Sequence, residues 1–141
     1  MRFLLDTNVV MHLANHARGH ENILAHLRRV TAAQCALSAM SAYEVRYAIE
    51  RGPGRVKKEN IERLEIAFQS VVVLPVTGTI AEAAAIVRAE LAGKGIGIGE
   101  HDSIIAAHAL ALGLTCVTDN EKHFARARAD AGKLAGCLRR V

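Results

Sequence analysis

Short apolar runs alternate along this chain with longer stretches in which apolar residues recur every three or four positions. A short continuous apolar run is typical of a buried parallel strand, and the longer spacing is typical of an amphipathic helix. The pattern predicts four strands, at Met1–Leu5, Cys35–Ser38, Val71–Leu74 and Leu114–Thr118. It predicts helices over residues 41–51, 57–69, 79–93 and 102–112, and a further helical stretch over 9–30. This alternation indicates an α/β domain around a parallel sheet.

The composition limits the class of protein. A chain of 141 residues is long enough for one hydrophobic core and is expected to form a single domain over residues 1–141. Because 51% of the residues are hydrophobic and 23% are charged, a disordered chain is excluded. The longest apolar stretch, Ser103–Val117, is interrupted by His108 and falls short of the ~18 residues typical of a membrane span. Three scattered cysteines without C-x-x-C spacing favour a reducing compartment, the cytoplasm.

Positive charge is concentrated at the end of the chain. The formal net charge is +4, and residues 122–141 hold six basic side chains against the single acidic residue Asp130. Such a cluster suits a polyanionic partner such as nucleic acid, and Arg126, Arg128 and Lys133 are candidates for contacts with it. Only 4% of the residues are aromatic and none is tryptophan, so we expect nucleic acid to be held mainly by charge and shape.

Acidic residues follow the predicted strands. The chain has only four aspartates, and Asp6, Asp102 and Asp119 each fall at a strand end or a helix start. Glu44, in the first turn of the helix after the second strand, could face the same edge of the sheet, which is where open parallel sheets bind ligands. Carboxylates that converge on one cleft repel each other, and a hard divalent cation, Mg²⁺ or Mn²⁺, is the usual resolution.

Each of these acids also has an ordinary structural explanation. Asp6 could close an Asx turn with the polar residues that follow it. The spacing Ser41-x-x-Glu44 is that of a capping box, which taken alone is the better explanation of Glu44. Asp102 could be an acid in the first turn of a helix, and Asp119 could be a turn residue. The functional interpretation therefore depends on all four residues lying together at one edge of the sheet.

Four segments, taken in order, resemble a known family. They are Leu4–Asn8 (LLDTN), Ser41–Val45 (SAYEV), Gly97–Ala109 (GIGEHDSIIAAHA) and Val117–Phe124 (VTDNEKHF). They are similar to the PIN-domain ribonucleases of the VapC toxin type, and the third segment is the most specific. The resemblance implies a three-layer fold with a central parallel sheet of four or five strands flanked by helices. It also implies Mg²⁺- or Mn²⁺-dependent cleavage of RNA, a homodimer, and inhibition by a small cognate antitoxin.

The resemblance assigns roles to individual residues. Asp6, Glu44 and Asp102 match the acidic triad of the family, and Asp119 stands where a fourth acidic or amide residue is found. Thr7, Asn8 and Thr118 match polar positions that would hydrogen-bond the carboxylates and fix their orientation. In the implied reaction, a water activated by the metal attacks the phosphodiester in line.

Two other classes of protein share parts of this pattern. A phosphatase of the haloacid-dehalogenase type also places a catalytic aspartate after its first strand, but it needs a second acid two residues later, where this chain has Asn8. A non-enzymatic domain of PIN type that binds nucleic acid or a protein partner would keep the same acids unused. Metal-dependent cleavage of RNA distinguishes the nuclease from this second alternative.

Overall fold

The computed structural model describes residues 1–14, 25, 30–118 and 138–140, and its centre is one parallel sheet. The sheet has five strands in the order β3-β2-β1-β4-β5, and every neighbouring pair is parallel. The strands are β1 Phe3–Leu5, β2 Cys35–Ser38, β3 Val72–Leu74, β4 Thr115–Thr118 and β5 Leu138–Arg140. The first four confirm the strands predicted from the apolar runs, and β5 is the fifth strand that the resemblance allowed and that the pattern of apolar residues did not locate.

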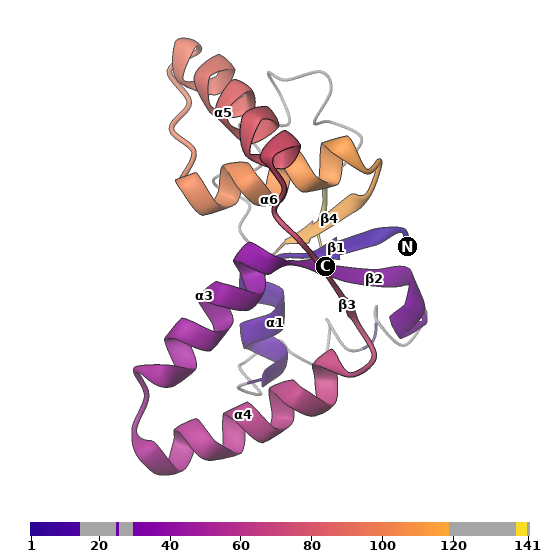
Figure 1. Cartoon of the computed structure of the whole chain (residues 1–141), viewed down its shortest axis with the longest axis vertical. Coiled ribbons are helices and arrows are strands. Elements are labelled where there is room, and N and C mark those ends of the chain that lie inside the picture. The colour runs from indigo at the N-terminus through magenta and orange to yellow at the C-terminus, as the bar shows by residue number, and fades with distance from the viewer. Residues whose placement is uncertain (15–24, 26–29, 119–137, 141) are drawn as a thin grey trace.

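Among the described residues, five helices and one 3₁₀ turn connect the strands. They are α1 Thr7–Ala14, the 3₁₀ turn η1 Ala32–Gln34, α3 Ala39–Glu50, α4 Gly54–Phe68, α5 Gly78–Gly93 and α6 Glu100–Ala111. Figure 1 shows α5 and α6 on one side of the sheet and α1, α3 and α4 on the other. The fold is therefore the predicted three-layer arrangement, with helices on both faces of a parallel sheet. None of the helices within the described residues is both long enough and apolar enough to cross a membrane.

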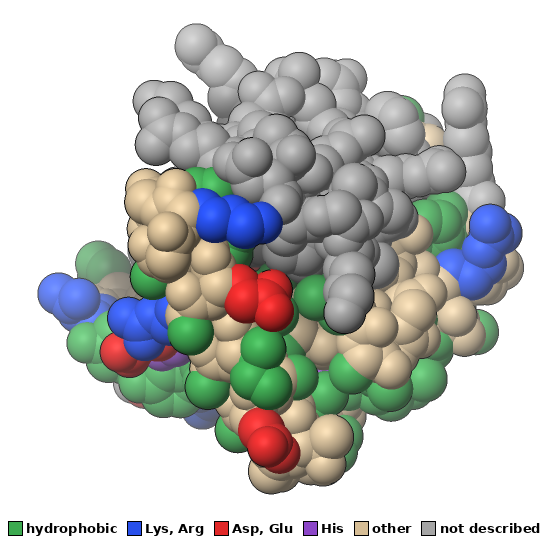
Figure 2. Space-filling model, turned by 90° about the horizontal axis from the view of Figure 1, so that it is seen from above, with side chains coloured by type: hydrophobic (Ala, Val, Ile, Leu, Met, Phe, Trp, Pro, Cys, Tyr) green, Lys and Arg blue, Asp and Glu red, His purple; other side chains and the backbone are tan. Residues whose placement is uncertain are grey.

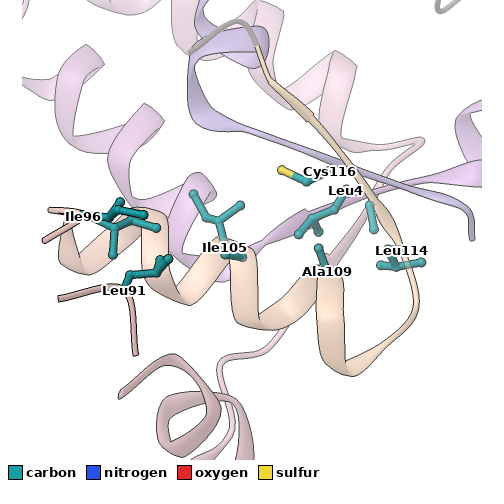
Figure 3. Close-up of a cluster of buried hydrophobic side chains, with 10 residues drawn as sticks. Leu4, Leu91, Ile96, Ile105, Ala109, Leu114 and Cys116 are labelled. Atoms are coloured by element: carbon teal, nitrogen blue, oxygen red, sulfur yellow. The ribbon is translucent and has the colours of Figure 1, made fainter. Parts of the chain in front are cut away.

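Successive residues of each central strand face opposite layers, as the geometry of a strand requires. Leu4 of β1 packs in a cluster with Cys116 of β4 and with Ile105 of α6 (Figure 3). Leu5, the next residue, belongs to a second cluster on the other face, which includes Val9 of α1. Because both faces of these strands are buried, the strands are apolar at consecutive positions rather than at alternate ones.

Helix α6 lies between the sheet and α5, and its composition follows from that position. Residues 105–109 are all buried, and three of them are alanine. Small side chains allow α5 to pack closely over α6. Gly113 then ends the helix with φ at +61°, a conformation that glycine adopts without strain, and the N–H of Leu114 donates to the carbonyl of Ala109 at 2.8 Å.

The surface at the α5 end of the molecule carries charges of both signs. In Figure 2, which looks down on this end, individual Lys or Arg and Asp or Glu side chains stand among hydrophobic ones in the described part of the surface. The described residues of this face therefore do not form a patch of one sign. The chemistry that the sequence points to is concentrated instead at the carboxyl edge of the sheet.

A buried histidine, His108 of α6, joins three elements at that edge. Its Nε2 lies 3.1 Å from the carbonyl oxygen of Pro75, which follows β3, and its Nδ1 lies 2.9 Å from Oγ of Ser38 at the end of β2. A carbonyl only accepts hydrogen bonds, so Nε2 carries the hydrogen and Nδ1 accepts one from the Ser38 hydroxyl. Burial lowers the pKa of His108, so the ring is neutral in the folded protein.

The first prediction concerns the pH dependence of stability. The unfolded chain takes up a proton at His108 near its ordinary pKa of 6.5, which the folded protein resists. The contribution of His108 to stability is therefore fully present above that pKa and is lost as the pH falls below it. Thermal unfolding should show a lower Tm at about pH 5.5 than at about pH 7.5. In His108→Gln, which can still donate to Pro75, this drop should be smaller, and an equal drop in both proteins would contradict the assignment.

Candidate active site

Asp6 is the most deeply buried acid of the site, with 2% of its surface exposed. It follows β1 directly and precedes the first residue of α1. One carboxylate oxygen accepts the N–H of Thr7 at 2.7 Å, and the other accepts the hydroxyl of Thr118, the last residue of β4, at 2.6 Å. Because β1 and β4 are paired in register, Leu5 against Val117, the residues that follow this pair meet at the sheet edge.

Glu44 lies one turn inside α3, and the capping-box explanation of it is wrong. The helix begins at Ala39, and its N-cap is Ser38, whose hydroxyl accepts the N–H of Met40 at 3.1 Å. Ser41 is consequently inside the helix, and its hydroxyl is buried without a hydrogen-bond partner among the described residues. Strand β2 runs directly into the helix, so the end of the strand decides which serine caps it. Glu44 is therefore not part of a capping box.

Instead, side chains from two other helices hold Glu44. The hydroxyl of Thr7, on α1, donates to Oε2 of Glu44. Nδ1 of His101, on α6, lies 2.6 Å from Oε1. No local pattern in the sequence pairs His101 with Glu44, because 57 positions separate them in the chain. Both oxygens of the carboxylate are therefore oriented by the fold.

Asp102 occupies the third position of α6, where an acid is favoured by the partial positive charge of the helix start. A Cβ atom at Gly99, the N-cap, would lie 3.6 Å from Oδ2 of Asp102, so the carboxylate turns back over the beginning of the helix. It helps to line a pocket, whose residues are Glu44, Arg88, Gly99, Glu100, His101 and Asp102. No local pattern in the sequence points to Arg88, since only the packing of α5 on α6 brings it here, where it pairs with Glu100 at 3.0 Å.

The three carboxylates act on one another electrostatically. Burial raises the pKa of Asp6 above its ordinary value, whereas the hydrogen bonds from Thr118 and from the backbone of Thr7 lower it. The negative charges of Asp102 and Glu44 raise the pKa of Asp6 further, so the three acids share one neighbourhood. Such a site is unfavourable for three ionised groups and favourable for a cation.

The donor atoms suit Mg²⁺ or Mn²⁺ better than Zn²⁺, because hard carboxylate oxygens predominate over imidazole and there is no thiolate in the pocket. Within the described ranges, no group of three or more His, Cys, Asp or Glu side chains stands close enough together to hold an ion. The three acids therefore supply oxygen atoms of the kind that Mg²⁺ and Mn²⁺ prefer, but their side chains do not form a complete set of metal ligands within the described residues. The predicted fourth acid, Asp119, lies outside the described residues.

The remaining predicted residues divide into two groups. Thr7 and Thr118 each hydrogen-bond an acid of the site, as described above. Asn8 is exposed on α1, and no hydrogen bond within the described residues joins it to these carboxylates. The proposed RNA contacts, Arg126, Arg128 and Lys133, lie outside the described residues.

The chain belongs to the PIN-domain family, whose model matches residues 3–130. It is 30% identical over 127 residues to ribonuclease VapC2 of Rickettsia felis, an alignment that covers 89% of this chain and 92% of that protein. It is 33% identical over 131 residues to the tRNA(fMet)-specific endonuclease VapC of Salmonella typhimurium, with the same coverage. The first of these relatives is named as a ribonuclease and the second as an endonuclease specific for a transfer RNA.

Solved structures give the same result for the fold. The VapBC2 complex of Rickettsia felis bound to a promoter DNA fragment contains a chain that superposes with a TM-score of 0.80 at 28% identity, covering 100% of this chain and 99% of that one. A chain of FitAcB from Neisseria gonorrhoeae superposes with a TM-score of 0.79 at 29% identity, covering 89% and 92%. Several of the similar structures are toxin–antitoxin complexes of the VapBC type.

The second prediction concerns the effect of the Asp6 carboxylate on the thermal stability of the fold. The pKa of Asp6 is raised in the folded protein, so its ionised form opposes folding as the pH rises through that pKa. An asparagine can accept from the N–H of Thr7 and donate to the oxygen of Thr118. In EDTA at neutral pH, Asp6→Asn should therefore melt at the same temperature as the wild type or higher.

Thr118→Val is the matched control for this measurement. It keeps the shape of the side chain but leaves Oδ2 of the buried Asp6 without its hydroxyl donor. We expect it to destabilise the protein by roughly 1–3 kcal/mol. A large fall in Tm for Asp6→Asn, comparable to that of Thr118→Val, would contradict the interpretation that the ionised carboxylate opposes folding.

Proposed function

We propose that this protein is a divalent-metal-dependent endoribonuclease, the toxin of a type II toxin–antitoxin pair, with a single PIN domain over residues 1–141. The observation that carries the proposal is the juxtaposition of Asp6, Glu44 and Asp102 at the carboxyl edge of the sheet, where the latter two raise the pKa of the first. The names of the relatives support the ribonuclease activity, and the VapBC complexes support an antitoxin partner.

Asp6, Glu44, Asp102 and Asp119 would hold the metal ion, Mg²⁺ or Mn²⁺. When bound, such an ion polarises the phosphoryl oxygens and lowers the pKa of a water so that it can attack the phosphodiester. The protein's contribution is orientation: Thr118 and the N–H of Thr7 fix Asp6, while the Thr7 hydroxyl and His101 fix Glu44. Arg126, Arg128 and Lys133 are proposed to contact phosphates of the RNA.

Two further parts of the proposal concern assembly and location. A second copy of the chain would complete a homodimer, and a small antitoxin would bind the toxin and block its site. Cys35 and Cys116 are both buried, and the three scattered cysteines of the chain suit a reducing compartment such as the cytoplasm.

The third prediction tests the activity itself. A labelled pool of total RNA should be cut in Mg²⁺ or Mn²⁺ and left intact in EDTA. The transfer RNA tRNA(fMet) is included as a substrate because one relative is named for it. Asp6→Asn and Asp102→Asn should each abolish cleavage while the proteins stay folded. Glu62→Gln, which removes an equal charge from an exposed position on α4, should cleave like the wild type.

Either of two results would overturn the proposal. A fully active Asp6→Asn protein would exclude the site, and binding of RNA without cleavage in any metal would favour a nucleic-acid-binding domain in place of a nuclease.

The fourth prediction concerns Thr7, which we propose to act by positioning Glu44. Thr7→Val keeps the side-chain shape but removes the hydroxyl, and it should lower kcat/KM by roughly 10- to 100-fold and raise the Mg²⁺ concentration needed for half-maximal activity. Thr7→Ser keeps the hydroxyl and should restore most of both. Equal losses in the two variants would show that the hydroxyl of Thr7 has no such role.

A further inference from the structure

Both tyrosines of the chain lie on α3, and both are exposed. The chain has two tyrosines and no tryptophan, and Tyr43 and Tyr47 are separated by one helical turn. Their rings are stacked, with centroids 6.0 Å apart and planes 13° from parallel. Tyr43 is 55% exposed and Tyr47 is 52% exposed, so packing in the core does not account for them.

The stacked pair is extended at both ends. On the side away from the site, the guanidinium of Arg51, the C-cap residue of α3, lies 5.7 Å from the centre of the Tyr47 ring. On the other side, Tyr43 meets the ring of His101 edge to face at a centroid distance of 6.0 Å. We call Arg51, Tyr47, Tyr43 and His101 the aromatic row. His101 bonds Glu44 and lines the pocket, so one end of the row is part of the candidate active site.

The chemistry of the aromatic row favours single-stranded nucleic acid as its occupant. Unpaired bases stack on exposed aromatic side chains in a way that tolerates any sequence, and a guanidinium beside such rings can meet a phosphate or a base. In a duplex these base faces are already stacked on their neighbours. The row also leads directly to the carboxylates of the site, through His101, which hydrogen-bonds Glu44.

We propose that the aromatic row binds unpaired bases of the RNA substrate and guides the strand into the candidate active site. The proposal rests on the proposed ribonuclease function and states which part of the RNA substrate the protein binds, namely its unpaired bases. It predicts a preference for single-stranded segments, such as loops, over duplex RNA. Stacking then supplies affinity that the low aromatic content of the sequence did not lead us to expect.

Intrinsic fluorescence tests the proposal directly. Because the chain has no tryptophan, its tyrosine emission comes from Tyr43 and Tyr47 alone. The Asp6→Asn protein, which is expected not to cleave, is titrated in Mg²⁺ with a single-stranded oligoribonucleotide of about ten residues. The parallel titrations use an abasic oligonucleotide of equal charge and an RNA duplex. The single strand should quench the emission, and the abasic strand and the duplex should quench it far less.

Substitutions at Tyr47 test the stacking without disturbing Glu44, because Tyr47 lies a turn away from the site. Binding is followed by the fluorescence anisotropy of a labelled oligoribonucleotide. Tyr47→Leu keeps the apolar bulk and removes the aromatic face, and it should weaken binding by roughly ten-fold. Tyr47→Phe keeps the face and should bind like the parent protein. Thermal unfolding of both variants checks that neither has lost its fold.

The outcomes distinguish this proposal from the proposed function. Base-dependent quenching of the Asp6→Asn protein, together with no cleavage of RNA by the wild type in Mg²⁺ or Mn²⁺, would support the aromatic row and refute the nuclease. Metal-dependent cleavage with the same kcat/KM in Tyr47→Leu as in the wild type would support the nuclease and refute the row. Equal quenching by the abasic strand would refute the row as well. Loss of binding to a co-expressed antitoxin in Tyr47→Leu, with RNA binding unchanged, would show that the row is a protein interface instead.

Discussion

Everything in the site depends on a carboxylate that the fold buries where two central strands end. Asp6 is removed from water, and its oxygens are met by Thr118 and by the backbone of Thr7. Two more acids stand near enough to raise its pKa. Burying charge beside like charge costs stability, so this arrangement is better explained by ligand binding than by folding. A divalent cation bound between the carboxylates would make their closeness electrostatically favourable. We propose that the site binds such an ion for the hydrolysis of RNA.

The scaffold around the site is held by a second, neutral polar network. Ser38 ends β2 and caps α3, the helix that carries Glu44, and its hydroxyl also donates to His108 of α6. Helix α6 carries Asp102 near its start. One buried serine and one buried histidine thereby link the two helices that present acids from opposite sides of the sheet. Because the network is buried and its groups are paired, it can fix the two helices relative to each other.

The surface that leads away from the acids has a different character. The pocket is bordered by Arg88 paired with Glu100, and beyond His101 the exposed row of Tyr43 and Tyr47 continues along α3. Composition alone suggested that aromatic stacking would contribute little to binding nucleic acid. The number of aromatic residues is indeed small, but the fold gathers both tyrosines beside the acids. Where a few rings lie can matter more for recognition than how many a chain contains.

The sequence by itself determined the alternation of strands and helices, the parallel sheet, and the identity of the acids, since these follow from periodicity and from which residues end apolar runs. It did not reveal β5, because two of its three residues are arginine and the segment reads as part of a basic tail. It also favoured the wrong serine as the cap of α3, because Ser41 has the capping-box spacing to Glu44, whereas the end of β2 makes Ser38 the cap. Contacts such as Glu44 with His101 join residues far apart in the chain. Strand order and helix packing create such contacts, and a local pattern carries no information about them.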